Sequence, residues 1–131
     1  MNQLPKNVLI IDDDSRNIFA LKATLASYGF TCYTASSAQE GIDMLSKNTG
    51  IKIVLMDMMM PEMDGYEAIR IIRNNDKISN LSVIAVTAQA MVGDKEKCLQ
   101  AGMDDYLSKP IDLNHLAVII EKWAMKKKVV A

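Results

Sequence analysis

The stretch Val8-Leu9-Ile10-Ile11-Asp12-Asp13-Asp14 joins four apolar residues directly to three aspartates. A short run that is apolar throughout and rich in β-branched residues is typical of a strand buried on both faces of a sheet. Strands of this kind occur in parallel sheets that helices cover on both sides. The stretch therefore predicts a β-strand over 8–11 that ends in a group of carboxylates.

Similar apolar runs recur along the chain, and amphipathic runs separate them. The expected strands are 8–11, 30–34, 51–56, 82–86 and 106–107. The expected helices are one that carries Leu21 and Leu25 and stops at Gly29, then 38–47 with a capping box at Ser37 and Glu40, one capped by Asp64, then 91–100 stopping at Gly102, and 113–127 capped by Asp112. Five strand–helix repeats predict an α/β fold, a doubly wound five-stranded parallel sheet with helices on both faces.

Composition limits the possible classes of protein. The chain has 131 residues, a net charge of −1, 50% hydrophobic and 24% charged residues. This balance excludes a disordered chain and a polybasic nucleic-acid binder, and it predicts a single domain over 1–131 with its core over about 7–125. No apolar run approaches the ~18 residues of a membrane span, which predicts a cytoplasmic protein with no membrane contact. Cys32 and Cys98 show no metal-binding spacing and are expected to be reduced, half-buried thiols.

Polar side chains follow the ends of several expected strands. In chain order they are Asp12, Asp13 and Asp14, then Asp57, then Thr87, and then Ser108 and Lys109. The carboxyl ends of parallel strands meet at one edge of a sheet, so these groups are expected to converge. Crowded carboxylates repel one another, and a hard divalent cation such as Mg²⁺ (or Mn²⁺) relieves that repulsion.

These residue types together suit a phosphoryl group. A metal held by carboxylates and the ammonium group of Lys109 supply positive charge, and Thr87 supplies a hydroxyl donor. Asp57 supplies a carboxylate that can attack phosphorus. Any one of these residues alone is more ordinary as a cap, a turn or a surface group. Their occurrence at successive strand ends favours a site.

Four motifs in this order resemble the receiver domains of two-component response regulators. They are Val8-Leu9-Ile10-Ile11-Asp12-Asp13, Met56-Asp57-Met58-Met59-Met60-Pro61-Glu62-Met63-Asp64-Gly65, Val86-Thr87-Ala88 and Tyr106-Leu107-Ser108-Lys109-Pro110. The resemblance covers about 7–122, nearly the whole chain. It implies a flavodoxin-like fold with strand order 2-1-3-4-5 and a function in phosphorelay signal transduction.

The resemblance also implies how the acidic residues act. Asp57 matches the aspartate that accepts a phosphoryl group from a sensor histidine kinase or a histidine phosphotransfer protein. Asp13 matches the direct Mg²⁺ ligand, and Asp12 matches its acidic neighbour, which acts through water. Asp57 and the backbone carbonyl of Met59 would complete the protein ligands. Asp14 matches neither role and is expected to start the first helix.

The remaining motif residues match the switch of the family. Lys109 matches the lysine that pairs with the phosphoryl oxygens, and the bond before Pro110 matches a cis peptide. Thr87 matches the hydroxyl that moves toward the phosphoryl group, and Tyr106 the aromatic ring that turns inward with it. The output surface would be the fourth helix, the fifth strand and the fifth helix. A downstream protein would bind there, and a homodimer on phosphorylation is possible.

No turnover of an external substrate is expected, only self-phosphorylation and autodephosphorylation at Asp57. One enzyme alternative is a haloacid-dehalogenase-like small phosphatase with Asp12 as nucleophile and Asp14 as general acid. That family carries a late acidic pair beside its site, whereas Asp104-Asp105 precedes the fifth expected strand. A flavin- or nucleotide-binding module is disfavoured because no Gly-rich loop follows the first strand. The sequence leaves open a free-standing regulator or the receiver of a hybrid kinase.

The segment after Asp57 carries two further expectations. Pro61 and Gly65 fit a turn whose role is structural. Met59, two residues after Asp57, cannot hydrogen-bond a hydrolytic water well, whereas Gln89, two after Thr87, can. Slow decay of the acyl phosphate is therefore expected. The neighbouring methionines of the 58–60 run are expected to pack, to contact a partner, or both.

Overall fold

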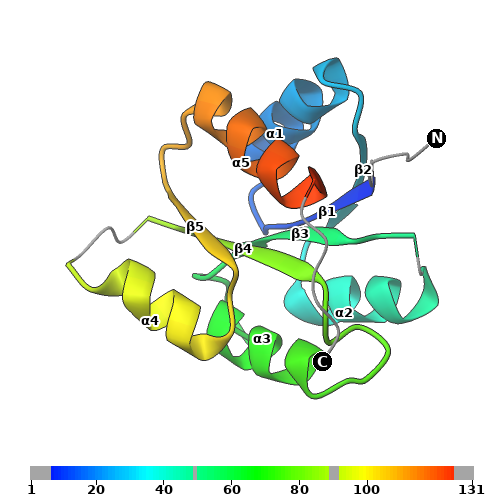
Figure 1. The fold of residues 1–131 in the computed structure, drawn as a ribbon, viewed down its shortest axis with the longest axis vertical. Helices are drawn as coiled ribbons and strands as arrows, with labels where there is room; N and C mark the ends of the chain where they lie inside the picture. The colour runs from blue at the N-terminus through cyan, green and yellow to red at the C-terminus, as the bar shows by residue number, and fades with distance from the viewer. Residues whose placement is uncertain (1–6, 49, 89–91, 126–131) are drawn as a thin grey trace.

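The computed structural model describes residues 7–48, 50–88 and 92–125, which alternate between strand and helix (Figure 1). The strands are β1 (Asn7–Ile11), β2 (Thr31–Ala35), β3 (Ile53–Asp57), β4 (Ser82–Thr87) and β5 (Asp105–Ser108). The helices are α1 (Ser15–Ser27), α2 (Ala38–Lys47), α3 (Gly65–Arg73), α4 (Asp94–Ala101) and α5 (Leu113–Met125). The predicted α/β alternation is confirmed. None of the described helices combines the length and hydrophobicity that crossing a membrane requires.

The five strands form one parallel sheet in the order β2-β1-β3-β4-β5. This confirms the predicted strand order. The register brings the carboxyl ends of neighbouring strands level: Ile11 pairs with Met56, Asp57 with Val86, and Thr87 with Ser108. Side chains at the ends of β1, β3, β4 and β5 therefore share one rim.

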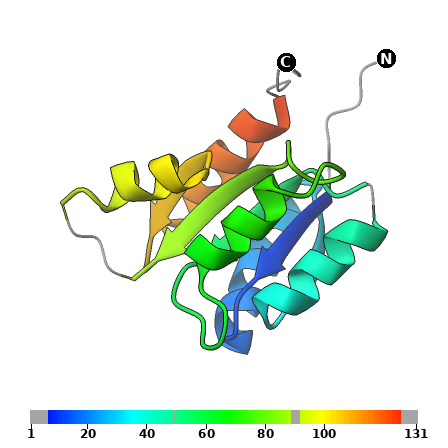
Figure 2. The same ribbon diagram turned by 90° about the horizontal axis from the view of Figure 1, so that it is seen from below.

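Helices α1 and α5 cover one face of the sheet, and α2, α3 and α4 cover the other (Figures 1 and 2). Alternate strand residues supply the two halves of the core, as the two-residue period of a strand requires. Leu9 and Ile11 pack with the side of α2, α3 and α4, whereas Val8 and Ile10 pack with α1 and α5. Both faces are buried, which explains the continuous apolar run of β1.

Side-chain caps start four of the five described helices. The carboxylates or hydroxyls accept from backbone N–H groups of the first turn at 2.9–3.2 Å, and the capping residues are Asp14, Ser37, Asp64 and Asp112. All four were expected from the sequence. Gly29 ends α1 with φ +90, a conformation that favours glycine.

Some boundaries differ from those predicted. β2 begins at Thr31, because the Phe30 N–H bonds back to the Leu25 carbonyl in the cap of α1. β3 begins at Ile53, since its pairing with Val8 starts there, although Ile51 is also buried. α4 begins at Asp94, three residues later than predicted. The predicted start of that helix at residue 91, the predicted last two residues of α5 (126–127) and residue 89 lie outside the described ranges. Of the two thiols, Cys32 is half-buried as expected, whereas Cys98 is fully buried.

Candidate functional site

The rim gathers three nearly inaccessible polar side chains at the ends of three strands. Asp12, Asp57 and Thr87 are 2%, 4% and 5% exposed. Asp13 is exposed beside them, and Lys109 reaches them from the loop after β5. The polar side chains at the strand ends therefore lie together, as the sequence predicts. A polar group at so low an exposure needs partners, and Lys109 lies within 3.5 Å of both buried carboxylates.

Asp57 lies at the centre of this group. Its Oδ1 accepts from the Met59 backbone N–H at 3.0 Å, and its Oδ2 lies 3.2 Å from the Lys109 ammonium nitrogen. Burial raises the pKa of Asp57, and repulsion from Asp12 adds to this, against the lowering effects of the Met59 N–H and of Lys109. The carboxylate is therefore held in an environment that disfavours its charge.

Asp12 is the second buried carboxylate. Its Oδ2 lies 3.5 Å from the Lys109 ammonium and accepts from the Asn17 side-chain amide at 2.6 Å. Its Oδ1 accepts from the Asp14 backbone N–H at 2.9 Å. Asn17 was not identified from the sequence; its place in the first turn of the helix that Asp14 caps is the signal that could have found it. Asn17 fixes the orientation of the Asp12 carboxylate toward the rim.

The acidic group has the composition of a divalent-cation site. One carboxylate oxygen from each of Asp12, Asp13 and Asp57 lies within 4.8 Å of the others. Oxygen donors of this charge and spacing fit Mg²⁺, which binds a few carboxylates and keeps several waters. The exposure of Asp13 leaves one side open to solvent. The role of the Met59 backbone carbonyl stays a prediction.

Lys109 connects both buried carboxylates to β4. Its backbone N–H donates to the Thr87 carbonyl at 2.8 Å, and the bond to Pro110 is cis, as expected. Burial lowers the pKa of the Lys109 ammonium, but attraction to Asp57 and Asp12 outweighs this and leaves the pKa raised. The side chain is therefore a fixed positive charge at the rim.

The loop after Asp57 is held tightly to the sheet. The Met58 N–H donates to the Val86 carbonyl at 2.9 Å, and the Met63 N–H closes a turn on the Pro61 carbonyl at 2.8 Å. A Cβ at Gly65 would lie 3.0 Å from the Met58 Cα, so a larger residue does not fit there. The turn expected at Pro61 and Gly65 is present, and its purely structural role stays a prediction.

The three methionines of this loop differ in exposure. Met58 and Met60 are buried, whereas Met59 is 54% exposed. Packing in the core therefore explains Met58 and Met60. Met59 leaves an apolar side chain in solvent beside Asp57.

Tyr106 lies on β5, half-buried against the core cluster on the side of α2, α3 and α4. Burial raises the pKa of its hydroxyl, and the nearby Asp94 and Cys98 add to this. Thr87 ends the neighbouring strand β4, two residues beyond the partner of Tyr106, since Ala85 pairs with Tyr106 and Thr87 with Ser108. The two residues of the predicted switch are thus on adjacent strands; their movement stays a prediction.

Comparison with known proteins agrees with this geometry. The profile of the response regulator receiver domain family matches residues 8–121. Sensor histidine kinase RcsC of Salmonella typhi is 40% identical over 117 residues, which are 89% of this chain and 12% of the kinase. Hybrid signal transduction histidine kinase I of Dictyostelium discoideum is 40% identical over 124 residues, which are 89% of this chain and 7% of the kinase. The chain therefore spans only a small part of the length of these relatives.

Two solved structures are similar throughout. The receiver domain of sensor histidine kinase PA1611 from Pseudomonas aeruginosa PAO1 has a TM-score of 0.84 at 33% identity, covering 92% of this chain and 98% of that one. That structure holds a magnesium ion coordinated in its active-site cleft. The receiver domain of Saccharomyces cerevisiae Ssk1, solved with the histidine phosphotransfer protein Ypd1, has a TM-score of 0.82 at 29% identity, covering 94% and 92%. None of these findings supports the alternative of a phosphatase with Asp12 as nucleophile.

Proposed function

Because the chain belongs to the response regulator receiver domain family of phosphorelay signalling, we propose that Asp57 accepts a phosphoryl group from a phosphohistidine. The observation that carries this proposal is the position of Asp57: a buried carboxylate 3.2 Å from the Lys109 ammonium, beside two further carboxylates. We place the receiver unit at about residues 7–125.

In the transfer, a carboxylate oxygen of Asp57 attacks the phosphorus atom of the donor. The new O–P bond forms as the P–N bond breaks, and the departing imidazole nitrogen takes the electron pair and then a proton. The Lys109 ammonium already lies within reach of Asp57 and can bind an oxygen of the incoming group. The product is an acyl phosphate on the protein, which water hydrolyses, so no external substrate is turned over.

Asp12, Asp13 and Asp57, with the backbone carbonyl of Met59, would hold Mg²⁺ (or Mn²⁺). The bound ion supplies positive charge that offsets both the carboxylates and the phosphoryl oxygens. Asn17 and the Asp14 N–H hold Asp12 in the orientation that this requires. The acidic cluster of this chain and the magnesium in the similar PA1611 receiver both support this choice of metal.

Phosphorylation would then shift a two-state equilibrium. The Thr87 hydroxyl bonds to the phosphoryl group in the active state, and Tyr106 turns inward as Thr87 moves. The shift in population can be no larger than the differential affinity of the phosphoryl group for the two states. The surface that responds is α4, β5 and α5, and a downstream protein would bind there.

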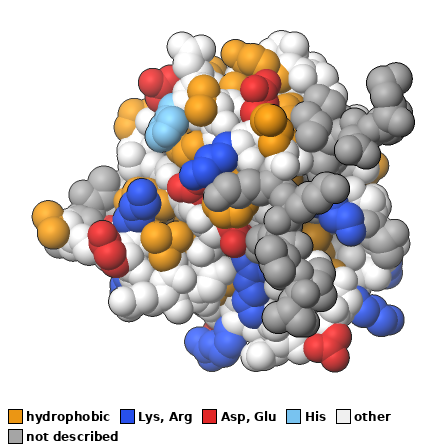
Figure 3. Space-filling model, in the orientation of Figure 1, with side chains coloured by type: hydrophobic (Ala, Val, Ile, Leu, Met, Phe, Trp, Pro, Cys, Tyr) orange, Lys and Arg blue, Asp and Glu red, His pale blue; other side chains and the backbone are white. Residues whose placement is uncertain are grey.

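The solvent face of α1 is suited to a partner that carries the histidine. α1 begins three residues after Asp12, and its Phe19 is 76% exposed, with Ala20, Ala23 and Ala26 exposed beside it. An exposed aromatic ring among small apolar residues is a common element of protein interfaces. On the face seen in Figure 3, which looks onto α5 and not onto α1, acidic and basic side chains are interspersed without a large patch of one charge. We therefore place the kinase or phosphotransfer protein over α1 and the rim.

Phe19→Ala tests this docking surface. We expect phosphotransfer from a histidine phosphotransfer protein to slow by roughly tenfold, since one interface anchor contributes about this much. Phosphorylation by acetyl phosphate, which needs no docking, is expected to be unchanged. Ile71→Ala, at an exposed position of α3 on the opposite side, is the matched control. An equal loss with both phosphodonors would argue against docking at α1.

The proposed function itself is tested by intact mass after incubation with acetyl phosphate and Mg²⁺. We expect one phosphoryl adduct on the wild type, none on Asp57→Asn and none with a chelator. Steady release of phosphate that survives Asp57→Asn but not Asp12→Asn would instead indicate the phosphatase mechanism.

A further inference from the structure

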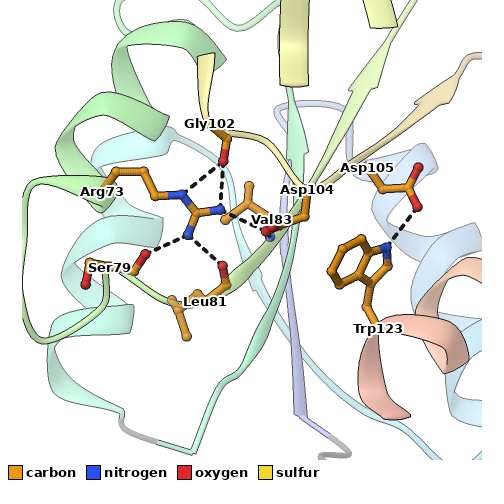
Figure 4. Close-up of polar contacts among 8 residues, drawn as sticks. All are labelled: Arg73, Ser79, Leu81, Val83, Gly102, Asp104, Asp105 and Trp123. Carbon is orange, nitrogen blue, oxygen red and sulfur yellow. Dashed lines mark hydrogen bonds and ion pairs between the residues drawn. The ribbon is translucent and has the colours of Figure 1, made fainter. Parts of the chain in front are cut away.

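Arg73, the last residue of α3, uses every N–H group of its guanidinium (Figure 4). Nε and Nη2 donate to the Gly102 carbonyl at 3.0 and 2.8 Å, and Nη1 donates to the carbonyls of Ser79 and Leu81 at 2.8 and 2.6 Å. Nη2 also bonds to Asp104 Oδ2 at 2.8 Å. An arginine has five such donors, so one side chain joins the end of α3, the approach to β4 and the segment between α4 and β5.

Asp104 extends this cluster into the sheet. Its Oδ2 also accepts from the Val83 N–H at 2.7 Å, and its own N–H donates to the Val83 carbonyl at 2.8 Å. Gly102, which ends α4, has φ +116, and a Cβ there would lie 3.3 Å from the Arg73 side chain. Arg73, Gly102 and Asp104 together form what we name the Arg73 anchor. It fixes the C-terminal end of α4 to β4.

The other end of α4 is held differently. Its N-cap residue is Gly93, which has no side chain to accept from the first-turn N–H groups, whereas the other four described helices have an acidic or hydroxyl cap. Within α4 only Cys98 is buried. Its sulfur lies 3.7 Å from the Tyr66 hydroxyl, and the Lys97 ammonium lies 4.9 Å from the Tyr66 ring. Both of these contacts are to Tyr66 alone, whereas the Arg73 guanidinium bonds to four different residues.

We propose that Arg73 is a positioning residue of the switch, which holds the C-terminal end of α4 while the N-terminal end swings. α4 follows the segment that begins at Thr87, the end of β4 at the rim. A rearrangement at the rim therefore reaches the N-terminal end of α4 first, and the anchor converts it into rotation about residues 102–104. This inference rests on the proposed phosphoryl switch. It adds that the α4 part of the output surface changes mainly at its rim end.

Two backbone amides report the two ends of α4. The Lys97 N–H bonds to the Gly93 carbonyl at 3.0 Å, and the Met103 N–H bonds to the Cys98 carbonyl at 3.1 Å. We would follow their hydrogen exchange by NMR before and after adding Mg²⁺ and beryllofluoride, a phosphoryl analogue. In the wild type we expect the hydrogen-exchange rate of the Lys97 N–H to change by about tenfold or more, since a hydrogen bond gained or lost at a charged phosphoryl group is worth at least about tenfold in a local equilibrium. We expect the exchange rate of the Met103 N–H to change by less than about twofold, because the Arg73 anchor holds that end of α4.

Arg73→Lys keeps the charge but removes the fork of donors. In this variant we expect the beryllofluoride response to extend to Met103, again by about tenfold, while beryllofluoride still binds with similar affinity. Arg70→Lys, one turn earlier on the exposed side of α3, is the matched control and should behave as the wild type. Should Arg73→Lys fail to fold, Asp104→Asn weakens the same anchor more gently and should give a smaller response at Met103.

Two outcomes would overturn the proposal alone: equal responses at Lys97 and Met103 in the wild type, or an Arg73→Lys protein whose pattern matches that of Arg70→Lys. A purely stabilising role for Arg73 predicts that second result, together with a lower melting temperature. The absence of any beryllofluoride response in the wild type would count against the proposed function, and the anchor's role in the switch would be rejected with it.

Discussion

Replacing Asp57 with asparagine should stabilise the protein when no divalent cation is present. The substitution keeps the shape of the side chain and an oxygen that can accept from the Met59 N–H, now bonded at 3.0 Å. It removes one of the three carboxylate charges on the rim. Lys109 keeps Asp12 as a partner, since its ammonium lies 3.5 Å from that carboxylate.

The expected magnitude follows from the distances. At an effective dielectric constant of about 20, the attraction of Lys109 at 3.2 Å contributes about 5 kcal/mol. Repulsion from Asp12 and from Asp13, each within 4.8 Å, contributes at least about 3.5 kcal/mol apiece. Solvent screens the exposed Asp13, so repulsion and attraction nearly cancel, and burial of the Asp57 charge, the largest cause of its raised pKa, decides the sign. We expect a gain of about 1–2 kcal/mol in the free energy of unfolding.

The gain should depend on pH and on Mg²⁺. The pKa of Asp57 in the folded protein is raised by burial, so the folded state binds this proton more tightly than the unfolded state does. The wild type therefore loses stability as the pH rises through that folded pKa, and the difference between the two proteins vanishes below the unfolded value of about 3.9. Mg²⁺ at a hundred times its Kd should stabilise the wild type by about 2.7 kcal/mol, and Asp57→Asn by much less.

Urea unfolding, followed by Trp123 fluorescence and far-UV circular dichroism, measures these differences at neutral pH. Asp76→Asn, at an exposed position away from the rim, is the control and should change stability by less than about 0.5 kcal/mol. A loss of more than 1 kcal/mol for Asp57→Asn in chelator, on the scale that a broken buried ion pair gives, would refute the reasoning. It would mean that the pair with Lys109 outweighs carboxylate repulsion.

Three further predictions concern single side chains. Gly65→Ala should lower the free energy of unfolding by about 1–3 kcal/mol, because its Cβ meets Met58; a neutral result in urea would show that the loop yields. Trp123→Phe should cost about 1.5–3 kcal/mol by removing the 2.8 Å bond to Asp105 (Figure 4). Burial alone raises the pKa of Asp105, yet the Trp123 bond and others leave it lowered, so this cost should shrink as the pH falls below about 4; a constant cost would contradict the assignment. Met59→Asn should speed decay of the acyl phosphate several-fold, measured by loss of the phosphoryl adduct over time; an unchanged rate would reject a role for Met59.

The helices and the site could be predicted because their signals are local. Asp14, Ser37 and Asp64 start helices by bonding to N–H groups two or three residues away, so short sequence spacings suffice. The convergence of Asp57 and Lys109, far apart in sequence, followed from one topological rule about parallel strands.

Contacts without such a rule were not found from the sequence. Arg73 and Gly102 are separated by 29 residues, and nothing in their spacing indicates a bond between them. The true start of β2 depends on the cap of α1 and that of β3 on pairing with β1, which a single apolar run cannot show. The uneven burial of Met58 and Met59 likewise depends on how the loop lies against α3.

The most direct test of the account is to locate the phosphoryl group on the chain. Borohydride reduces an acyl phosphate to an alcohol and releases the phosphate, which marks the modified aspartate as homoserine. After treatment with acetyl phosphate and Mg²⁺, peptide mass spectrometry should find homoserine at position 57, and none when chelator is present. Homoserine at position 12, or a phosphorylated protein with an unmodified Asp57, would contradict the central claim.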